Sequence, residues 1–108
     1  MRRLIAALGD SDRDVRQEAD RALTELAARA ASAVRPYFDQ LARAGAAEPL
    51  IVALRGGEPG AALALAKLGD ARAVEALIAA LGDSDRDVRQ QADRALTGLA
   101  ARRASHLT

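Results

Sequence analysis

Residues 4–29 read LIAALGDSDRDVRQEADRALTELAAR, and residues 77–102 read LIAALGDSDRDVRQQADRALTGLAAR. The two copies differ only where Glu18 becomes Gln91 and Glu25 becomes Gly98. A stretch that returns almost unchanged indicates a repeated structural unit. Repeat architecture then constrains function more than any single residue of this chain does.

Each copy predicts a pair of helices. In the first copy, apolar residues recur at helical spacing from Arg13 onward, which is typical of an amphipathic helix with one buried stripe. Asp12 is a favourable N-cap for this helix, and a shorter apolar helix before it ends at Gly9. In the second copy, Asp85 and Gly82 take the same two places. The stripes comprise Val15, Ala19, Ala22, Leu23, Leu26 and Ala27, and then Val88, Ala92, Ala95, Leu96 and Leu99. We expect Leu23 and Leu96 to be fully buried.

Composition agrees with an all-α fold. The 108 residues include 28 alanines and 15 leucines, whereas Tyr37 and Phe38 are the only aromatic residues. This mixture has a high helix propensity and few of the residues that favour strands. The chain has no cysteine, which excludes disulfides and thiolate chemistry.

The net charge of the chain is too small to attract a charged partner over a long range. With 16 basic and 15 acidic residues the net charge is +1, so no overall field attracts nucleic acid or an anionic membrane. No apolar stretch approaches the roughly 20 residues of a membrane span. We therefore expect a cytoplasmic protein. Fifteen arginines against one lysine favour a GC-rich bacterial source, and the near-perfect duplication leaves an engineered origin open.

A degenerate third pair and an insertion separate the two copies. Leu50, Ile51 and Leu54 mark its first helix, and Leu63, Leu65 and Leu68 mark its second. The copies are 73 residues apart, and matching the helices one by one leaves fifteen extra residues, which correspond to Ala30–Ala44. In this insert Val34, Tyr37, Phe38, Leu41 and Ala42 are spaced as one apolar face. We place Pro36 in the first turn of a separate short helix.

The chain resembles the HEAT repeat, in particular the HEAT-like repeats of the phycobilisome-lyase type. The resemblance rests on Asp10 with Val15 and Arg16, on their repeat as Asp83 with Val88 and Arg89, and on the sequence LGDARAVEALIAALGD at residues 68–83. It implies a ladder between neighbouring repeats, formed by the turn aspartates and the arginines: Asp10, Arg16, Asp83 and Arg89. It also implies that the second helix of each pair lines a concave binding surface. The middle pair departs from the family pattern, because Gly57 stands where the aspartate should be.

These observations predict a short right-handed α-solenoid of about three HEAT-like helix pairs with one inserted helix. We expect a single domain over residues 1–108. Its parts are a first pair at 1–29, the inserted helix at 30–44, the degenerate middle pair at 45–69 and the last pair at 70–104.

No motif indicates catalysis, and we expect neither a metal nor another cofactor. Asp10, Asp12 and Asp14 alternate as in a calcium loop, but Val15 stands where that loop needs glycine, and N-capping already explains these carboxylates. His106 is the only histidine, so neither a histidine cluster for zinc nor a conventional catalytic triad can be assembled. The glycine-rich stretch at residues 56–60 lacks the Lys-Ser or Lys-Thr of a phosphate loop. We expect a protein that is not an enzyme.

The predicted function is non-catalytic binding of a protein or peptide by the ridge of second helices. One part of the ridge, which we name the first row, comprises Arg13, Gln17, Asp20, Arg21 and Thr24. Its counterpart, the second row, comprises Arg86, Gln90, Asp93, Arg94 and Thr97. Tyr37 and Phe38 are candidate partner anchors, although their spacing is more typical of a core.

Two alternatives stay open: a ligand-binding role like that of chromophore lyases or their chaperones, and nucleic-acid binding by the arginines of the ridge. We do not expect a membrane partner. Because both terminal repeats look like internal ones, their uncapped ends also predict a homodimer or domain-swapped assembly.

Overall fold

The computed structural model describes residues 1–106, which form seven α-helices and one 3-10 helix and contain no strand. The elements are α1 (Arg2–Ala7), α2 (Arg13–Arg29), η1 (Ala31–Tyr37), α3 (Phe38–Arg43), α4 (Ala47–Arg55), α5 (Gly60–Leu68), α6 (Ala71–Ala80) and α7 (Arg86–His106). This result confirms the all-α fold class.

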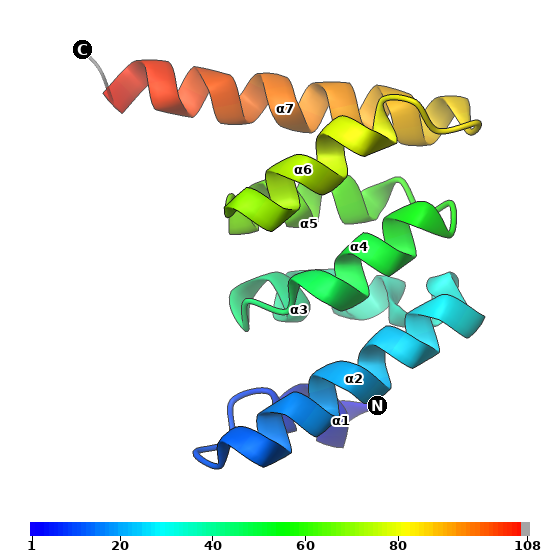
Figure 1. The fold of residues 1–108 in the computed structure, drawn as a ribbon, viewed down its shortest axis with the longest axis vertical. Helices are drawn as coiled ribbons and strands as arrows, with labels where there is room; N and C mark the ends of the chain where they lie inside the picture. Colours follow the sequence, from blue (N-terminus) through cyan, green and yellow to red (C-terminus); the bar gives the residue numbers. More distant parts are fainter. Residues whose placement is uncertain (107–108) are drawn as a thin grey trace.

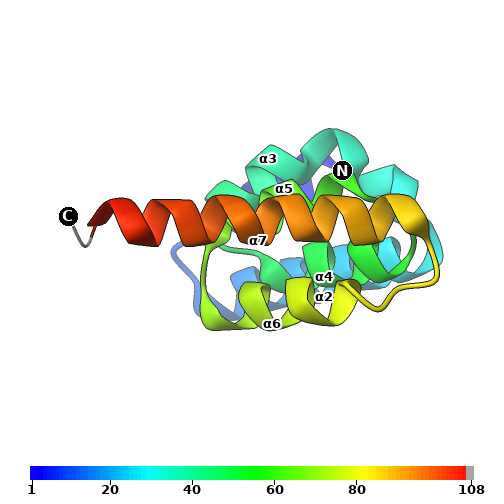
Figure 2. The same cartoon turned by 90° about the horizontal axis from the view of Figure 1, so that it is seen from above.

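The helices lie in two layers. Helices α2, α4 and α6 stack along the long axis of the molecule in one layer, while α3 and α5 lie behind them with α1 behind α2 (Figure 1). Helix α7 packs on α5 and α6 and continues the row of α3 and α5 (Figure 2). The chain therefore crosses between the layers at almost every turn.

Aspartates begin the helices as predicted. The side chain of Asp12 accepts a hydrogen bond of 2.8 Å from the backbone N–H of Asp14, and Asp85 accepts an equivalent bond from Asp87. A third cap, Asp70, accepts from the N–H of Ala73 at 2.8 Å and begins α6. Each bond satisfies one of the N–H groups that the first turn of a helix leaves without a partner.

The core consists of leucines and small residues from both layers. Its largest fully buried side chains are Leu23, Leu41, Leu50, Leu54, Leu65, Leu77, Val34, Val88 and Pro49. Burial of Leu23 confirms that prediction. Leu96 is only half-buried, so the expectation that it would match Leu23 is wrong. Leu63, which marks the predicted second helix of the middle pair, is exposed, as are Ile78 and Leu81 at the end of α6.

Residues 30–44 do not form a single inserted helix. They form η1 and then α3, and Pro36 lies inside the 3-10 helix rather than in the first turn of an α-helix. A proline has no N–H to donate, and the tighter 3-10 turn accommodates it before the α-helix begins. Val34 and Leu41 are fully buried, so the predicted apolar face does pack into the core.

The insertion places the two sequence copies in opposite layers. Helices α2 and α7 carry nearly the same sequence, yet α2 packs against α4 and α7 packs against α5. Because η1 and α3 add one crossing between the layers, α2 comes to lie beside α4 instead of beside α5 (Figure 1).

The buried stripe of the repeated helix consequently differs between the copies. Helix α2 buries Ala19, Leu23 and Ala27. Helix α7 buries Val88, Ala92 and Ala95. At 3.6 residues per turn the two stripes are rotated by roughly 70° around the helix axis. Val15 is 37% exposed, whereas its counterpart Val88 is 0% exposed.

Candidate functional site: the groove between α2 and α4

The first row lines two adjoining pockets on the layer of α2, α4 and α6. Gln17, Asp20, Arg21 and Thr24 contribute to a groove of about 440 Å³ that Glu48 of α4 borders from the other side. Arg13 joins Gln17 and Asp20 in a second pocket of about 280 Å³, closed by Leu8 and by the turn at residues 44–46. All five residues of the first row therefore face the same continuous surface.

Asp20 is the most unusual residue of this groove. One of its carboxylate oxygens, Oδ1, is buried and has no hydrogen-bond partner in the structure. Burial raises the pKa of the Asp20 carboxyl above its usual value of 3.8, and the nearby Glu48 carboxylate raises it further. The guanidinium of Arg72 on α6 lowers this pKa and opposes part of the effect. Because Oδ1 is buried without a donor, the ionised form of this carboxylate is costly in the folded state.

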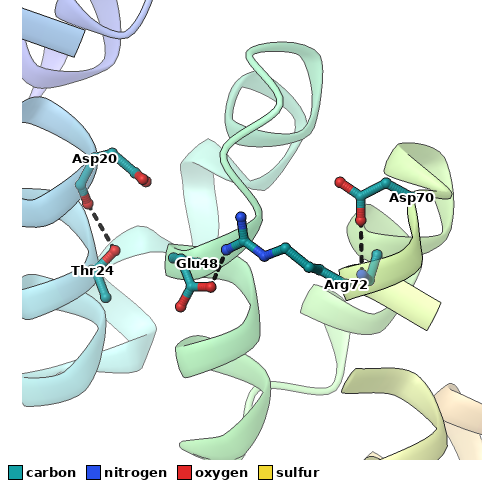
Figure 3. A network of polar contacts seen from close by, with 6 residues as sticks. Asp20, Thr24, Glu48, Asp70 and Arg72 are labelled. Carbon is teal, nitrogen blue, oxygen red and sulfur yellow. Dashed lines mark hydrogen bonds and ion pairs between the residues drawn. The ribbon is translucent and has the colours of Figure 1, made fainter. Parts of the chain in front are cut away.

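Glu48 and Arg72 extend the polar surface across α4 to α6. Their side chains form an ion pair between the two helices, and Asp70 holds the first turn of α6 from which Arg72 extends (Figure 3). On α2, the hydroxyl of Thr24 donates a 2.7 Å hydrogen bond to the backbone carbonyl of Asp20. Thr24 is thus oriented by its own helix, and Asp20 projects from the turn before it.

The raised pKa of Asp20 predicts a stabilising substitution. The Asp20 carboxyl binds a proton more tightly in the folded state than in the unfolded state. Its protonated form therefore favours folding at a pH below the unfolded pKa. This stabilisation is lost as the pH rises through the raised pKa of the folded state. We expect Asp20→Asn to raise the melting temperature at pH 7 and to lose this advantage near pH 3, measured by thermal unfolding with circular dichroism. The matched control is Asp93→Asn, because the equivalent Asp93 on α7 is exposed. A lower melting temperature for Asp20→Asn at pH 7 would contradict the prediction.

The second row lies on a different surface. All five of its residues are exposed on α7, which belongs to the opposite layer. The two rows therefore do not form parts of one ridge, because the added layer crossing separates their helices. The sequence predicted the membership of each row but not this separation.

Instead of forming a ladder between repeats, each of the two arginines bonds to the backbone of its own turn. Arg16 donates from Nη1 to the backbone carbonyls of Asp10 and Ser11, at 2.7 and 3.1 Å. Arg89 makes the same pair of bonds to Asp83 and Ser84, at 2.8 and 3.1 Å.

The carboxylates of the two turn aspartates accept hydrogen bonds from the backbone and not from the arginines. Asp10 accepts from the N–H of Asp12, and Asp83 accepts from the N–H of Asp85, both at 2.8 Å. The expectation that these aspartates pair with the arginines of neighbouring repeats is therefore wrong. The two residue types of the motif each stabilise the turn that carries them.

The aromatic residues of the insert are core residues rather than an exposed anchor. Phe38 is buried against the backbone of Gly60, where an added Cβ would lie 3.5 Å from its ring. Tyr37 is half-buried at the end of η1. The structure thus agrees with the core interpretation of the spacing and removes Phe38 from the candidate anchors.

Sequence reasoning missed several polar residues that organise the fold. Arg35 donates to both carboxylate oxygens of Glu58, at 2.9 and 2.6 Å, and Glu58 is only 9% exposed. Val34 and Arg35 repeat the Val-Arg dipeptide of the two copies, but Arg35 reaches a carboxylate 23 residues away, whereas the arginines of the copies bond to their own turns. Neither this pairing nor that of Glu48 with Arg72 had a sequence signal, because both join segments that only the fold brings together.

The segment from α5 to α6 shows the local geometry of a helical repeat. Helix α5 ends at Gly69, whose φ of +66° favours glycine, and Asp70 then begins α6 after a turn of two residues. Residues 60–83 match the family described as the PBS lyase HEAT-like repeat. This segment is a HEAT-like repeat. It spans α5 and α6 and so crosses the boundary expected between the middle pair and the last pair.

HEAT-like repeats are typically protein-binding modules and are usually non-catalytic, although some proteins related to PBS lyases are enzymes. No curated protein and no solved structure matches the chain. Within residues 1–106, none of the helices is both long enough and apolar enough to cross a membrane. His106 lies in the last turn of α7, and its side chain is outside the part of the chain that the structure describes.

Proposed function

We propose that this chain is a non-catalytic protein-binding or peptide-binding module whose binding site is the groove between α2 and α4. The observation that carries this proposal is the groove of about 440 Å³ in which Arg21 and Glu25 of α2 face Glu48 of α4. A bound segment could pair its own charged or hydrogen-bonding groups with these side chains. The typical role of HEAT-like repeats supports the same conclusion.

We also infer that the two layers form a short right-handed α-solenoid. The alternation of the chain between the layers and the HEAT-like repeat at residues 60–83 support this architecture. In this arrangement the helices alternate between the layers, the HEAT-like unit at residues 60–83 pairs α5 with α6, and residues 30–44 add an extra layer crossing. The binding groove then lies on the face formed by α2, α4 and α6.

A ligand-binding role like that of a chromophore lyase has less support. A largely apolar pocket lies between α4 and α6 and has a volume of about 140 Å³. Small-molecule sites typically occupy roughly 300–1,000 Å³. The larger groove beside α2 is open and is lined by polar and charged residues whose aliphatic portions also contribute surface, as suits an extended peptide.

The groove can be tested with peptides selected from a randomised display library against the folded chain. We expect selected peptides to bind at least about tenfold more weakly to Arg21→Glu, because this change reverses a charge on the groove wall. Binding is measured by isothermal titration calorimetry.

The matched control is Arg94→Glu, which makes the same change at the equivalent exposed position of α7. This variant should bind the selected peptides like the unmodified chain. Peptides that respond to Arg94→Glu and ignore Arg21→Glu would move the site to the other layer. A library that yields no binder would refute the proposed groove.

A further inference from the structure

The two adjoining pockets along α2 differ in charge. Arg13 and Arg16 line the pocket of about 280 Å³ near the start of the helix. Glu25 lines the groove of about 440 Å³ further along the same helix. At the centre, Asp20 contributes to both pockets and its neighbour Arg21 contributes to the groove, so their opposite charges offset each other. The continuous surface therefore has a basic end at the start of α2 and an acidic end toward its C-terminus.

The charges at the two ends are available to a partner. In the part of the chain whose side chains the structure describes, neither Arg13 nor Glu25 forms an ion pair. Arg16 donates from Nη1 to two backbone carbonyls of its turn, and these neutral groups leave its positive charge in place. Glu48 also borders the acidic end, but its carboxylate is paired with Arg72 of α6 (Figure 3). Arg13 and Glu25 therefore present the unpaired charges of the two ends.

The duplicated sequence separates the acidic end from the rest of the helix. The two copies differ at only two positions, and one of them is Glu25, whose counterpart on α7 is Gly98. The other is Glu18, which is exposed on α2 and lines neither pocket. Arg13, in contrast, keeps its counterpart Arg86 on α7. Only the copy that borders the groove therefore combines a basic start with an acidic end.

We propose that this surface binds an extended peptide segment that carries acidic residues at one end and basic residues at the other. The acidic residues of the segment lie against Arg13 and Arg16, and its basic residues lie against Glu25. Arg13 and Glu25 are 12 positions apart on α2, which is about 18 Å at 1.5 Å per residue. An extended chain covers that distance in about five to six residues. The inference rests on the proposed function and adds the charge pattern and the orientation of the partner.

The first test uses the peptides that a randomised display library yields against the folded chain. We expect their sequences to carry an acidic and a basic residue about five positions apart, matching the span of the groove. Their affinity should fall as the salt concentration rises, because the contacts join exposed charges. Peptides that bind the groove without this charge separation would overturn the inference and leave the proposed function in place. A library without binders removes the proposed function as well.

The second test reverses the charge at each end and measures peptide binding by isothermal titration calorimetry. We expect Arg13→Glu and Glu25→Lys each to raise the dissociation constant of the selected peptides by about threefold to tenfold. The matched controls are Arg86→Glu on α7 and Glu18→Lys on α2, which make the same changes at exposed positions outside the groove. These controls should bind like the unmodified chain. Equal losses in variants and controls would show an effect of net charge and would overturn the inference.

The third test determines which end of the peptide meets which end of the groove. For Glu25→Lys, we expect affinity to return when the basic residue of the peptide is replaced by glutamate. For Arg13→Glu, it should return when the acidic residue of the peptide is replaced by lysine. Such paired exchanges measure a direct interaction between the two positions. If neither exchange restores binding, or if each exchange rescues the variant at the opposite end, the proposed orientation is wrong.

Discussion

Leu23→Ala should lower the free energy of unfolding by about 2–5 kcal/mol, whereas Leu96→Ala should have a clearly smaller effect. The two leucines occupy the same position of the same repeated sequence. Leu23 is 0% exposed, whereas Leu96 is half-buried and lines an open cleft between α6 and α7. Truncating Leu23 leaves a cavity that the surrounding helices cannot fill, while solvent already reaches Leu96. Chemical denaturation of both variants, monitored by circular dichroism, measures the difference. Equal losses would show that α2 and α7 do not differ in their buried faces.

Substitution of the valines on the other side of the stripe should destabilise the protein more in α7 than in α2, the reverse of the order expected for the leucines. Val88→Ala removes two buried methyl groups and should cost roughly 2 kcal/mol, at about 0.8 kcal/mol per buried carbon with an added cavity contribution. Val15→Ala should cost much less, because Val15 is 37% exposed. The same denaturation experiment measures both variants.

The four variants together form a crossed comparison. In α2 the leucine should matter and the valine should not, and in α7 the valine should matter more than the leucine. Because the sequences around these positions are nearly identical, local helix propensity cancels in each comparison. If the valine pair instead follows the order of the leucine pair, the rotation of the buried stripe between the two helices is wrong.

Local features of the fold were predictable from the residues. Asp12 and Asp85 begin their helices as expected, since an N-cap needs only a carboxylate placed before the first turn. The apolar stripe of the repeated helix was identified only in part, because Val15 is exposed on α2 and Leu96 is half-buried on α7. The HEAT-like resemblance agrees with the repeat found at residues 60–83.

The candidate site was predictable only in part. The first row comes from the polar face of an amphipathic helix, and all five of its members do line the surface beside α4. Glu48 and Arg72 could not be added to it from the sequence, because their pairing depends on which helices become neighbours. The unpartnered oxygen of Asp20 likewise depends on the packing around it.

By itself, the sequence determined that the chain is helical, where several helices begin, and that one helical hairpin occurs twice. Only the tertiary structure decided what each copy of that hairpin packs against. An amphipathic stripe as wide as that of α2 and α7 can bury either of its sides, and neighbouring helices select the side. Because η1 and α3 insert one more crossing between the layers, α2 meets α4 and buries Leu23, whereas α7 meets α5 and buries Val88. Two helices of nearly the same sequence therefore present different surfaces: α2 borders the groove beside α4, and α7 borders an open apolar cleft beside α6.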